Sequence, residues 1–416
     1  MSWLQDFLDS TKELESPQSY FYWSILTVIS SVIGKKMWVS RGGSYNLYPN
    51  IYTFLISKKS GLRKGKPIDV AKKLAYEVGR VRVIDGQNSI QGVIKELAKI
   101  KTVGNGHVIK NAEGFLITGE FASFMLQDGV GFSLTTLTDL YNTHEHEYGF
   151  KKRLASQDEI ELKNLCLTAL FASNETHFFD SVPKNAITGG FLARTFCIYE
   201  EKRNTLNSLT KPLTHKIDYL RIIGYLGELA KLEGEIIAEP EALNIFHTWY
   251  HNFYEKDNED DTGTSERLGD NIWKAAMLIG LANNNTQIIT ENDMDEAIYQ
   301  CMITFNNLKR FLLGGTGDAK NIKSICMRTI VAAILETNPL FEIERKNVLK
   351  KGIGVFGVYD VDECIEHLLQ AGMIKIDKRG QGIYYKLTEV ALKRHLEGRR
   401  KENGEEKGEE TDGQNN

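Results

Sequence analysis

A basic segment that contains two glycines follows an apolar run early in the chain. The segment SKKSGLRKGKPID covers residues 57–69, and the apolar run before it covers residues 51–56. A strand, a glycine-containing loop and a helix in this order form a phosphate-binding site, because backbone N–H groups and the positive end of a helix attract anions. These residue types therefore indicate a nucleotide site at the start of a helix.

The motif G-x-x-x-x-G-K-[ST] is not met in either possible register. If Lys66 is the phosphate lysine, Ser60 replaces the first glycine and Pro67 replaces the hydroxyl residue. If Lys64 is the lysine, Arg63 stands before it and a glycine follows it. The sequence thus allows a working ATP site, a degenerate one, or a basic loop that binds no nucleotide.

Three later side chains could complete an ATPase site. The apolar stretch 113–126 predicts a strand beside the loop strand, and it contains Glu120, a residue type that orients the attacking water. The apolar strand 165–172 leads to Asn174, whose amide could hydrogen-bond the γ-phosphate or the water. Arg194 precedes another strand and could act as an arginine finger on a neighbouring subunit. The plainer alternatives are a helix cap, a turn residue and a surface salt bridge.

The stretch from Trp23 to about Leu312 resembles a phage and prophage family of P-loop ATPases that are helicase-like and often joined to primase domains. The matching motifs, in order, are YPNIYTFLISKKSGLRKGKPI, NSIQGVIKELAK, FLITGEFASFM, ALFASNETHFF, GGFLARTF and IWKAAMLIGLA. GGFLARTF is also similar to a motif of AAA+ ring helicases such as the minichromosome maintenance proteins. The resemblance implies an α/β P-loop NTPase core of the AAA+ or RecA-like type, ATP and Mg²⁺ as cofactors, and DNA as a partner. It also implies a homo-oligomer such as a hexameric ring, with primase or other replication proteins as further partners.

The same resemblance favours Lys64 as the phosphate lysine. The implied nucleotide-binding loop consists of Ser60, Gly61, Leu62, Arg63, Lys64, Gly65 and Lys66. Gly65 supplies no hydroxyl for Mg²⁺, and Gly119 stands where the Mg²⁺-linked Asp is usual, so we expect nucleotide binding with slow hydrolysis. No other metal site is expected.

A helical stretch further along supplies candidate lid residues. Arg267 and Lys274 lie seven residues apart on one predicted helix face. The resemblance implies that one of them lies over the nucleotide. A salt bridge to the acidic loop 256–261 is the alternative for Arg267.

Two basic clusters could contact DNA phosphates. Residues 141–163 read as a strand, a tip and a return strand that carries Lys151, Lys152 and Arg153. A hairpin in this position would point into the channel of a ring helicase, and a solvated charge run is the alternative.

The second cluster lies in a C-terminal segment whose three helices and β-hairpin follow the winged-helix pattern. Its hairpin, the wing, carries Lys375, Lys378 and Arg379. Its third helix carries carboxylates that phosphates would repel, namely Asp360, Asp362, Glu363 and Glu366. We therefore expect wing-led contact with nucleic acid.

Composition limits the class of protein. The 416 residues are 42% hydrophobic and 25% charged with a net charge of −4, as in a soluble globular protein, so any DNA contact must come from local patches. The apolar stretch 20–34 is too short for a membrane span and predicts a buried helix. Five scattered cysteines, with no signal peptide, predict unpaired thiols and a cytoplasmic location.

We expect five parts along the chain. They are an N-terminal helical segment (1–48), the P-loop α/β core (49–205), a helical lid domain (206–315), a winged-helix domain (316–396) and a disordered tail (397–416).

The expected function is an ATP-dependent, ring-forming DNA motor of a phage or mobile element, acting as a helicase or replication initiator. The alternative is a catalytically weakened nucleotide-binding loader or scaffold that binds DNA through its winged helix. A third class is a DNA-binding regulator whose α/β domain serves as an oligomerisation platform.

Overall fold

The computed structural model describes residues 3–58, 60–86, 89–104, 106–142, 150–153, 159–182, 190–207, 213–255, 263–315, 319–337, 340–352, 358–380, 382–389 and 391–392. The chain forms two compact units, residues 1–308 and 309–416, and each is described by itself. The predicted tail at 397–416 lies outside the described residues.

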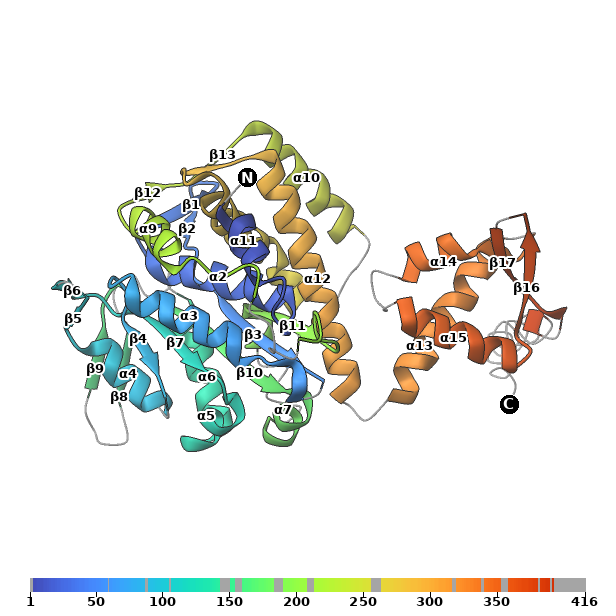
Figure 1. Cartoon of the computed structure of the whole chain (residues 1–416), viewed down its shortest axis with the longest axis horizontal. Coiled ribbons are helices and arrows are strands. Elements are labelled where there is room, and N and C mark those ends of the chain that lie inside the picture. Colours follow the sequence, from blue (N-terminus) through green and yellow to red (C-terminus); the bar gives the residue numbers. More distant parts are fainter. Residues whose placement is uncertain are drawn as a thin grey trace, which may run out of the picture. The chain divides into compact units, whose positions relative to one another are not determined.

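A five-stranded parallel sheet forms the centre of the first unit (Figure 1). Its strands, in chain order, are β3 (Tyr52–Ser57), β4 (Val83–Asp85), β7 (Glu113–Thr118), β10 (Cys166–Asn174) and β11 (Thr195–Glu200). In space the order is β11-β3-β10-β7-β4. The expectation that the Glu120 strand lies beside the loop strand is therefore wrong, because β10 lies between β3 and β7.

Helices cover both faces of this sheet. One face carries α2 (Gln18–Ile33) and α3 (Gly65–Glu77). In Figure 1 the opposite side carries α5 (Phe121–Gln127), α6 (Val130–Tyr141) and α7 (Glu175–Ser181). The rings of Phe54, Phe121 and Phe178 pack together there: Phe121 stacks on Phe178, and the Phe54 ring is tilted against Phe121 with centroids 4.6 Å apart. Both faces are apolar, as a fully covered parallel sheet requires.

Helix α2 crosses its face of the sheet in a fixed register. The Tyr20 hydroxyl donates to the Ile56 carbonyl (2.6 Å), and Thr27 and Thr53 share a hydroxyl hydrogen bond of 2.8 Å. Ser30 makes a similar bond to Thr168 on β10 (2.8 Å). The predicted buried helix is confirmed, since nearly all of α2 is inaccessible to solvent.

Among the helices of the described residues, none has the length and apolar character that a membrane span requires.

The N-terminal segment, the α/β core and most of the predicted lid share one hydrophobic core instead of forming separate parts. The additional helices are α1 (Trp3–Thr11), α9 (Tyr219–Leu229), α10 (Pro240–Tyr254), α11 (Thr264–Asn284) and α12 (Glu291–Gly315). Two small sheets join them: β12 (Gly234–Glu235), β1 (Met37–Arg41) and β2 (Tyr45–Leu47), and β13 (Ile237–Ala238) with β14 (Ile288–Ile289). Because α11 packs on α2 from the side away from the sheet, α2 is buried all round.

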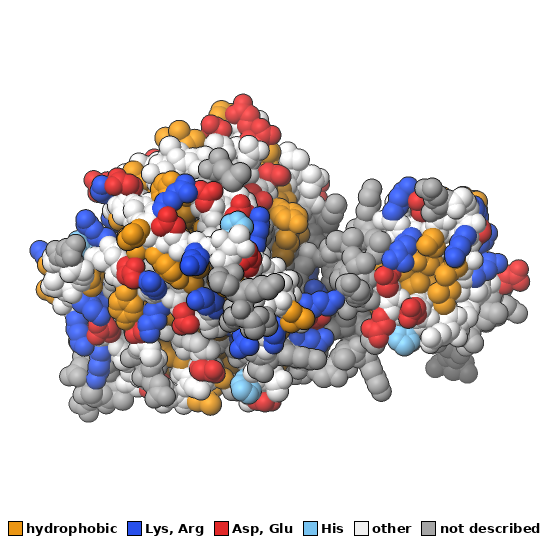
Figure 2. All heavy atoms as spheres, viewed as in Figure 1, with side chains coloured by type: hydrophobic (Ala, Val, Ile, Leu, Met, Phe, Trp, Pro, Cys, Tyr) orange, Lys and Arg blue, Asp and Glu red, His pale blue; other side chains and the backbone are white. Residues whose placement is uncertain are grey.

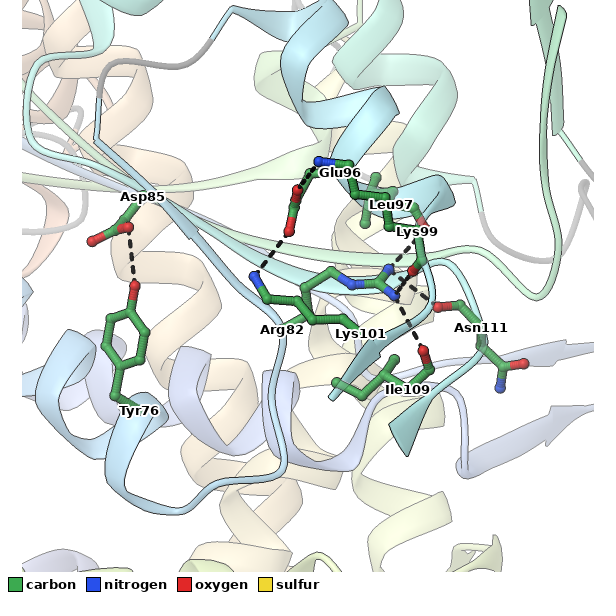
Figure 3. Close-up of polar contacts among 9 residues, drawn as sticks. All are labelled: Tyr76, Arg82, Asp85, Glu96, Leu97, Lys99, Lys101, Ile109 and Asn111. Atoms are coloured by element: carbon green, nitrogen blue, oxygen red, sulfur yellow. Dashed lines mark hydrogen bonds and ion pairs between the residues drawn. The ribbon is translucent and has the colours of Figure 1, made fainter. Parts of the chain in front are cut away.

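A buried arginine fixes the far edge of the sheet (Figure 3). The Arg82 side chain donates to the carbonyls of Leu97 (2.7 Å) and Lys99 (2.5 Å) at the end of α4 (Ile90–Ala98). It also donates to the carbonyl of Asn111 (3.2 Å), which follows the hairpin of β5 (Lys101–Val103) and β6 (His107–Ile109). These carbonyls would otherwise lack donors, so Arg82 holds the helix end and the hairpin together.

The second unit has its own core. It contains α13 (Ala319–Leu335), β15 (Glu342–Glu344), α14 (Arg345–Gly352), α15 (Val358–Gln370), β16 (Ile374–Arg379) and β17 (Gly382–Leu387). The strands form an antiparallel sheet in the order β15-β17-β16.

All five cysteines of the chain are buried and unpaired, which confirms the predicted free thiols.

Candidate functional site

Three neighbouring strands end at one edge of the parallel sheet and bring the predicted site residues together. Asn174 at the end of β10 is the register partner of Ser57 at the end of β3, and Thr118 at the end of β7 pairs with Phe171. The connection after β3 leaves along one face and the connection after β10 along the other. Open α/β sheets bind ligands at such switch points, outside the carboxyl ends of the strands.

The loop after β3 has the backbone of an anion-binding nest. Residues Ser60–Leu62 form a short 3-10 turn, and Arg63 then adopts a left-handed conformation with φ of 55°. Lys64 follows at the N-cap of α3, which begins at Gly65. A right-handed turn followed by a left-handed residue points successive N–H groups into one concavity. Glycine ordinarily occupies such a position, so Arg63 stands where the phosphate-loop motif has glycine before its lysine.

Of the two candidate phosphate lysines, only Lys64 turns back toward the sheet. Its amine donates to the Ser57 hydroxyl, and its side chain is half-buried. Burial lowers the pKa of Lys64, and the charge of the nearby Glu120 opposes that shift. Lys66 is exposed on the first turn of α3. The geometry therefore favours the Lys64 register.

Glu120 presents an exposed carboxylate at the start of α5. It occupies the N-cap position, but its side chain makes no capping hydrogen bond, so the helix-cap alternative is not what the structure contains. It lines a hollow of about 400 Å³ between α3 and the ends of β4 and β7. Other lining residues are Gly65, Asp69, Lys72, Asp85, Thr118 and Gly119.

The two missing Mg²⁺ ligands leave open space. A Cβ at Gly65 would meet no atom within 4 Å, and one at Gly119 would only touch the Ile68 side chain at 3.9 Å. Neither glycine has a positive φ, so residues with a Cβ can adopt both backbone conformations without strain. Within the described residues, no group of three or more His, Cys, Asp or Glu side chains is arranged to hold a metal ion.

Asn174 is the N-cap of α7, whereas the plainer alternative from the sequence was a turn residue. Its side-chain oxygen accepts a hydrogen bond from the His177 backbone N–H (2.8 Å) at the start of α7. Its amide nitrogen has no hydrogen-bond partner among the described residues. The capped side chain therefore keeps one donor at the carboxyl edge of the sheet.

Arg194, Arg267 and Lys274 do not join this edge. Arg194 precedes β11 and donates to Asn142 (3.2 Å) and to the Gly190 carbonyl (2.8 Å), with only 8% of its surface exposed. The Lys274 amine donates to the carbonyl and side-chain oxygens of Asn50 (2.8 Å each), directly before β3 begins. This group therefore lies at the amino ends of the strands. The expectation that Lys274 covers the loop nucleotide of its own chain does not match this placement, and Arg267 lies near Tyr141 in the same group.

The basic residues proposed to contact DNA differ in whether a nearby carboxylate pairs with their charge. Lys151 lies on β8 (Phe150–Arg153), which pairs with β9 (Glu159–Leu162), so the predicted two strands are present around a tip outside the described residues. Lys152 and Arg153 lie on the same strand. In the second unit Arg379 is held by Glu342 through two bonds of 2.8 Å and by Asp377. Lys375 and Lys378 are exposed and make no ion pair within the described part of the chain.

Two residues that lie beside the loop after β3 could not be identified from the sequence. Glu15 and Arg203 contact it from segments far apart in the chain, and no local motif marks them. Ser57 was overlooked because it reads simply as the last residue of a strand.

In comparisons with known proteins, no family model and no curated protein matches this chain.

The buried amine of Lys274 predicts a pH dependence of stability. Burial lowers its pKa to about 7, so between pH 7 and its ordinary pKa the unfolded chain binds a proton that the folded chain does not. Stability conferred by this site should therefore rise with pH over that window, by at most about 1.4 kcal/mol per pH unit.

The measurement is urea unfolding of wild type and Lys274→Met at pH 7, 8 and 9. All five tryptophans precede residue 308, so their fluorescence reports the first unit alone. The wild type should gain stability relative to Lys274→Met as pH rises. A constant difference would mean that the amine stays charged throughout.

Proposed function

We propose that the chain is a P-loop ATPase of the AAA+ or RecA-like type that acts on DNA as a helicase or replication initiator. The observation that carries the proposal is the loop between β3 and α3, where a left-handed residue precedes a half-buried lysine at a helix N-terminus. Backbone N–H groups of this loop and the Lys64 amine would bind the β- and γ-phosphates.

The strand order supports the proposal. Because β10 separates β3 from β7, Glu120 stands one strand away from the loop, with Asn174 between them. A γ-phosphate and an attacking water would lie between Lys64 and Glu120. Glu120 would orient the water, and the Asn174 amide would donate to the phosphate or the water.

Mg²⁺ is the weakest part of this fit. Gly65 and Gly119 supply no oxygen ligand, so the metal would be held mainly by the nucleotide's phosphates and by water. This deficit favours the second candidate function, a nucleotide-binding loader or scaffold with little hydrolysis.

The position of Arg194 is the basis for proposing that the protein assembles into a ring. An arginine at the amino ends of the strands cannot serve the site at the carboxyl ends of its own chain, but a neighbouring copy could receive it. Arg194 would first have to leave Asn142 and Gly190. The finger role therefore requires a rearrangement on assembly.

The DNA contact is proposed for the second unit. Its element order, a helix, a strand, two helices and a β-hairpin, supports the proposal that this unit is a winged helix. Figure 2 shows acidic side chains interspersed among basic ones on the visible face, so contact would depend on a few lysines and not on a broad basic surface. Lys375 and Lys378 on β16 are the best candidates, because Arg379 is neutralised by Glu342 and Asp377.

The Lys64 register can be tested with a matched pair of variants. Lys64→Ala should abolish MgATP binding, because it removes the lysine whose amine donates to Ser57 at the end of β3. Lys66→Ala removes an equal charge two residues away and should change affinity by less than about threefold. Isothermal titration calorimetry gives both values. Equal losses, or a larger loss for Lys66→Ala, would contradict the register.

Restoring the absent ligands distinguishes a slow ATPase from a scaffold. Gly65→Thr with Gly119→Asp should raise MgATP turnover at least about tenfold, because a Cβ meets no clash at either position and the added oxygens would hold the metal. The same double variant with Glu120→Gln should be inactive, which serves as the control. Turnover that stays at background in the restored protein would support the scaffold.

The wing contact predicts a change in salt dependence. Lys375→Ala with Lys378→Ala should weaken DNA binding and reduce the slope of log K against log salt by up to about 2. Lys346→Ala, which removes a lysine paired with Glu344 at 2.6 Å, is the control and should change little. An unchanged slope in the double variant, measured by fluorescence anisotropy with labelled duplex, would move the contact to the Lys151 cluster.

A further inference from the structure

One carboxylate bridges two arginines at the phosphate loop. Glu15 accepts a hydrogen bond from Arg63 Nε (3.0 Å) through one oxygen and from Arg203 Nη1 (3.0 Å) through the other. The Arg203 guanidinium lies over the loop, since a Cβ at Gly61 would come within 3.2 Å of its Nη2. Two guanidinium groups are therefore directed at a single anionic group beside the nest.

The backbone next to Glu15 is held independently of its side chain. The Ser16 hydroxyl donates to the Arg63 carbonyl (2.9 Å), and the Asn204 N–H donates to the Glu15 carbonyl (3.1 Å). The Asn204 amide also donates to the Lys12 carbonyl (2.7 Å). The Glu15 carboxylate also accepts a hydrogen bond from the Asn207 backbone N–H, so it must leave this donor as well as the arginines when it rotates away, while the segment stays in place.

We propose that Glu15 occupies the position of a nucleotide phosphate, and that Arg203 and Arg63 contact the polyphosphate once it displaces this carboxylate. Arg203 then becomes a nucleotide-binding residue and Glu15 a built-in competitor that lowers affinity. The inference rests on the proposed function, since it assumes that a nucleotide binds the Lys64 loop.

The chemistry favours exchange of one anion for the other. A phosphate carries more charge and more acceptor oxygens than a carboxylate, and guanidinium groups bind it in a bidentate manner. The arginines of these ion pairs are partly exposed, with 65% of the Arg63 side chain and 34% of the Arg203 side chain accessible, whereas 16% of the Glu15 side chain is accessible. Solvent at the arginines weakens both pairs. If Glu15 stayed between the arginines, its charge would repel the incoming phosphate.

The experiment measures MgATP affinity of the full chain by isothermal titration calorimetry. Glu15→Gln should bind about three- to tenfold tighter than wild type, because the variant loses the competing charge. Arg203→Met should bind at least about tenfold more weakly, and adding Glu15→Gln to it should restore less than Glu15→Gln gains alone. Glu13→Gln is the matched control, since Glu13 accepts from the Thr214 N–H (2.7 Å) and makes no contact with either arginine among the described residues. Melting curves without nucleotide should show all variants folded.

The outcomes separate this inference from the proposed function. If wild type binds MgATP and Lys64→Ala does not, the nucleotide site stands. Glu15→Gln that then binds equally or more weakly, or Arg203→Met that binds like wild type, would overturn the competitor and leave Glu15 as a structural tie. If wild type and Lys64→Ala both fail to bind MgATP, the nucleotide site itself is wrong and the inference falls with it.

Discussion

The position of α2 against the sheet is the constraint on which the other features of the first unit depend. Its hydroxyl groups form hydrogen bonds with hydroxyl groups of β3 and β10, and these groups are buried away from water. A shift of α2 along the sheet would therefore leave several of these hydroxyl groups without a hydrogen-bond partner. Within α2, Tyr20 lies beside the end of β3, and Gly34, directly after the helix, lies close to Glu113 at the start of β7. The segment that precedes α2 is thereby placed at the loop that follows β3, and α11 is placed on the outer side of α2.

Local patterns were enough to predict the strands and the buried helix. Apolar runs such as 51–56 and the stretch 20–34 carry their own signals of burial and length. The strand order was not predictable in the same way, because it depends on which strands pair across more than a hundred residues. Thus the Glu120 strand was expected beside the loop strand, whereas β10 lies between β7 and β3. The shared core of three expected parts has the same cause, since Trp23 and Trp273 join a single cluster that no sequence window contains.

The candidate site likewise has some features that local sequence predicts and others that depend on residues distant in the chain. Lys64 and Glu120 could be selected because each lies a few residues after a recognisable strand, and parallel strands bring such positions to one edge. Lys274 was misplaced because helical periodicity gives the face of a residue but not the end of the sheet that it meets. Arg379 reads as a free charge in sequence, whereas Glu342, which neutralises it, is 37 residues away. The left-handed backbone of Arg63 has no sequence signature, since glycine would be the expected residue there.

The separate cores of the two units have a thermodynamic consequence. Cys326, Ile334 and Tyr385 belong to a cluster that contains no residue of the first unit, so neither core needs the other to remain apolar inside. Unfolding of the whole chain is then a sum of two transitions and not one all-or-none event. A ligand that binds only the first unit raises the midpoint of that unit's transition by mass action and leaves the other in place. For this chain a single melting temperature is therefore an average over two equilibria, and ligand binding would separate them.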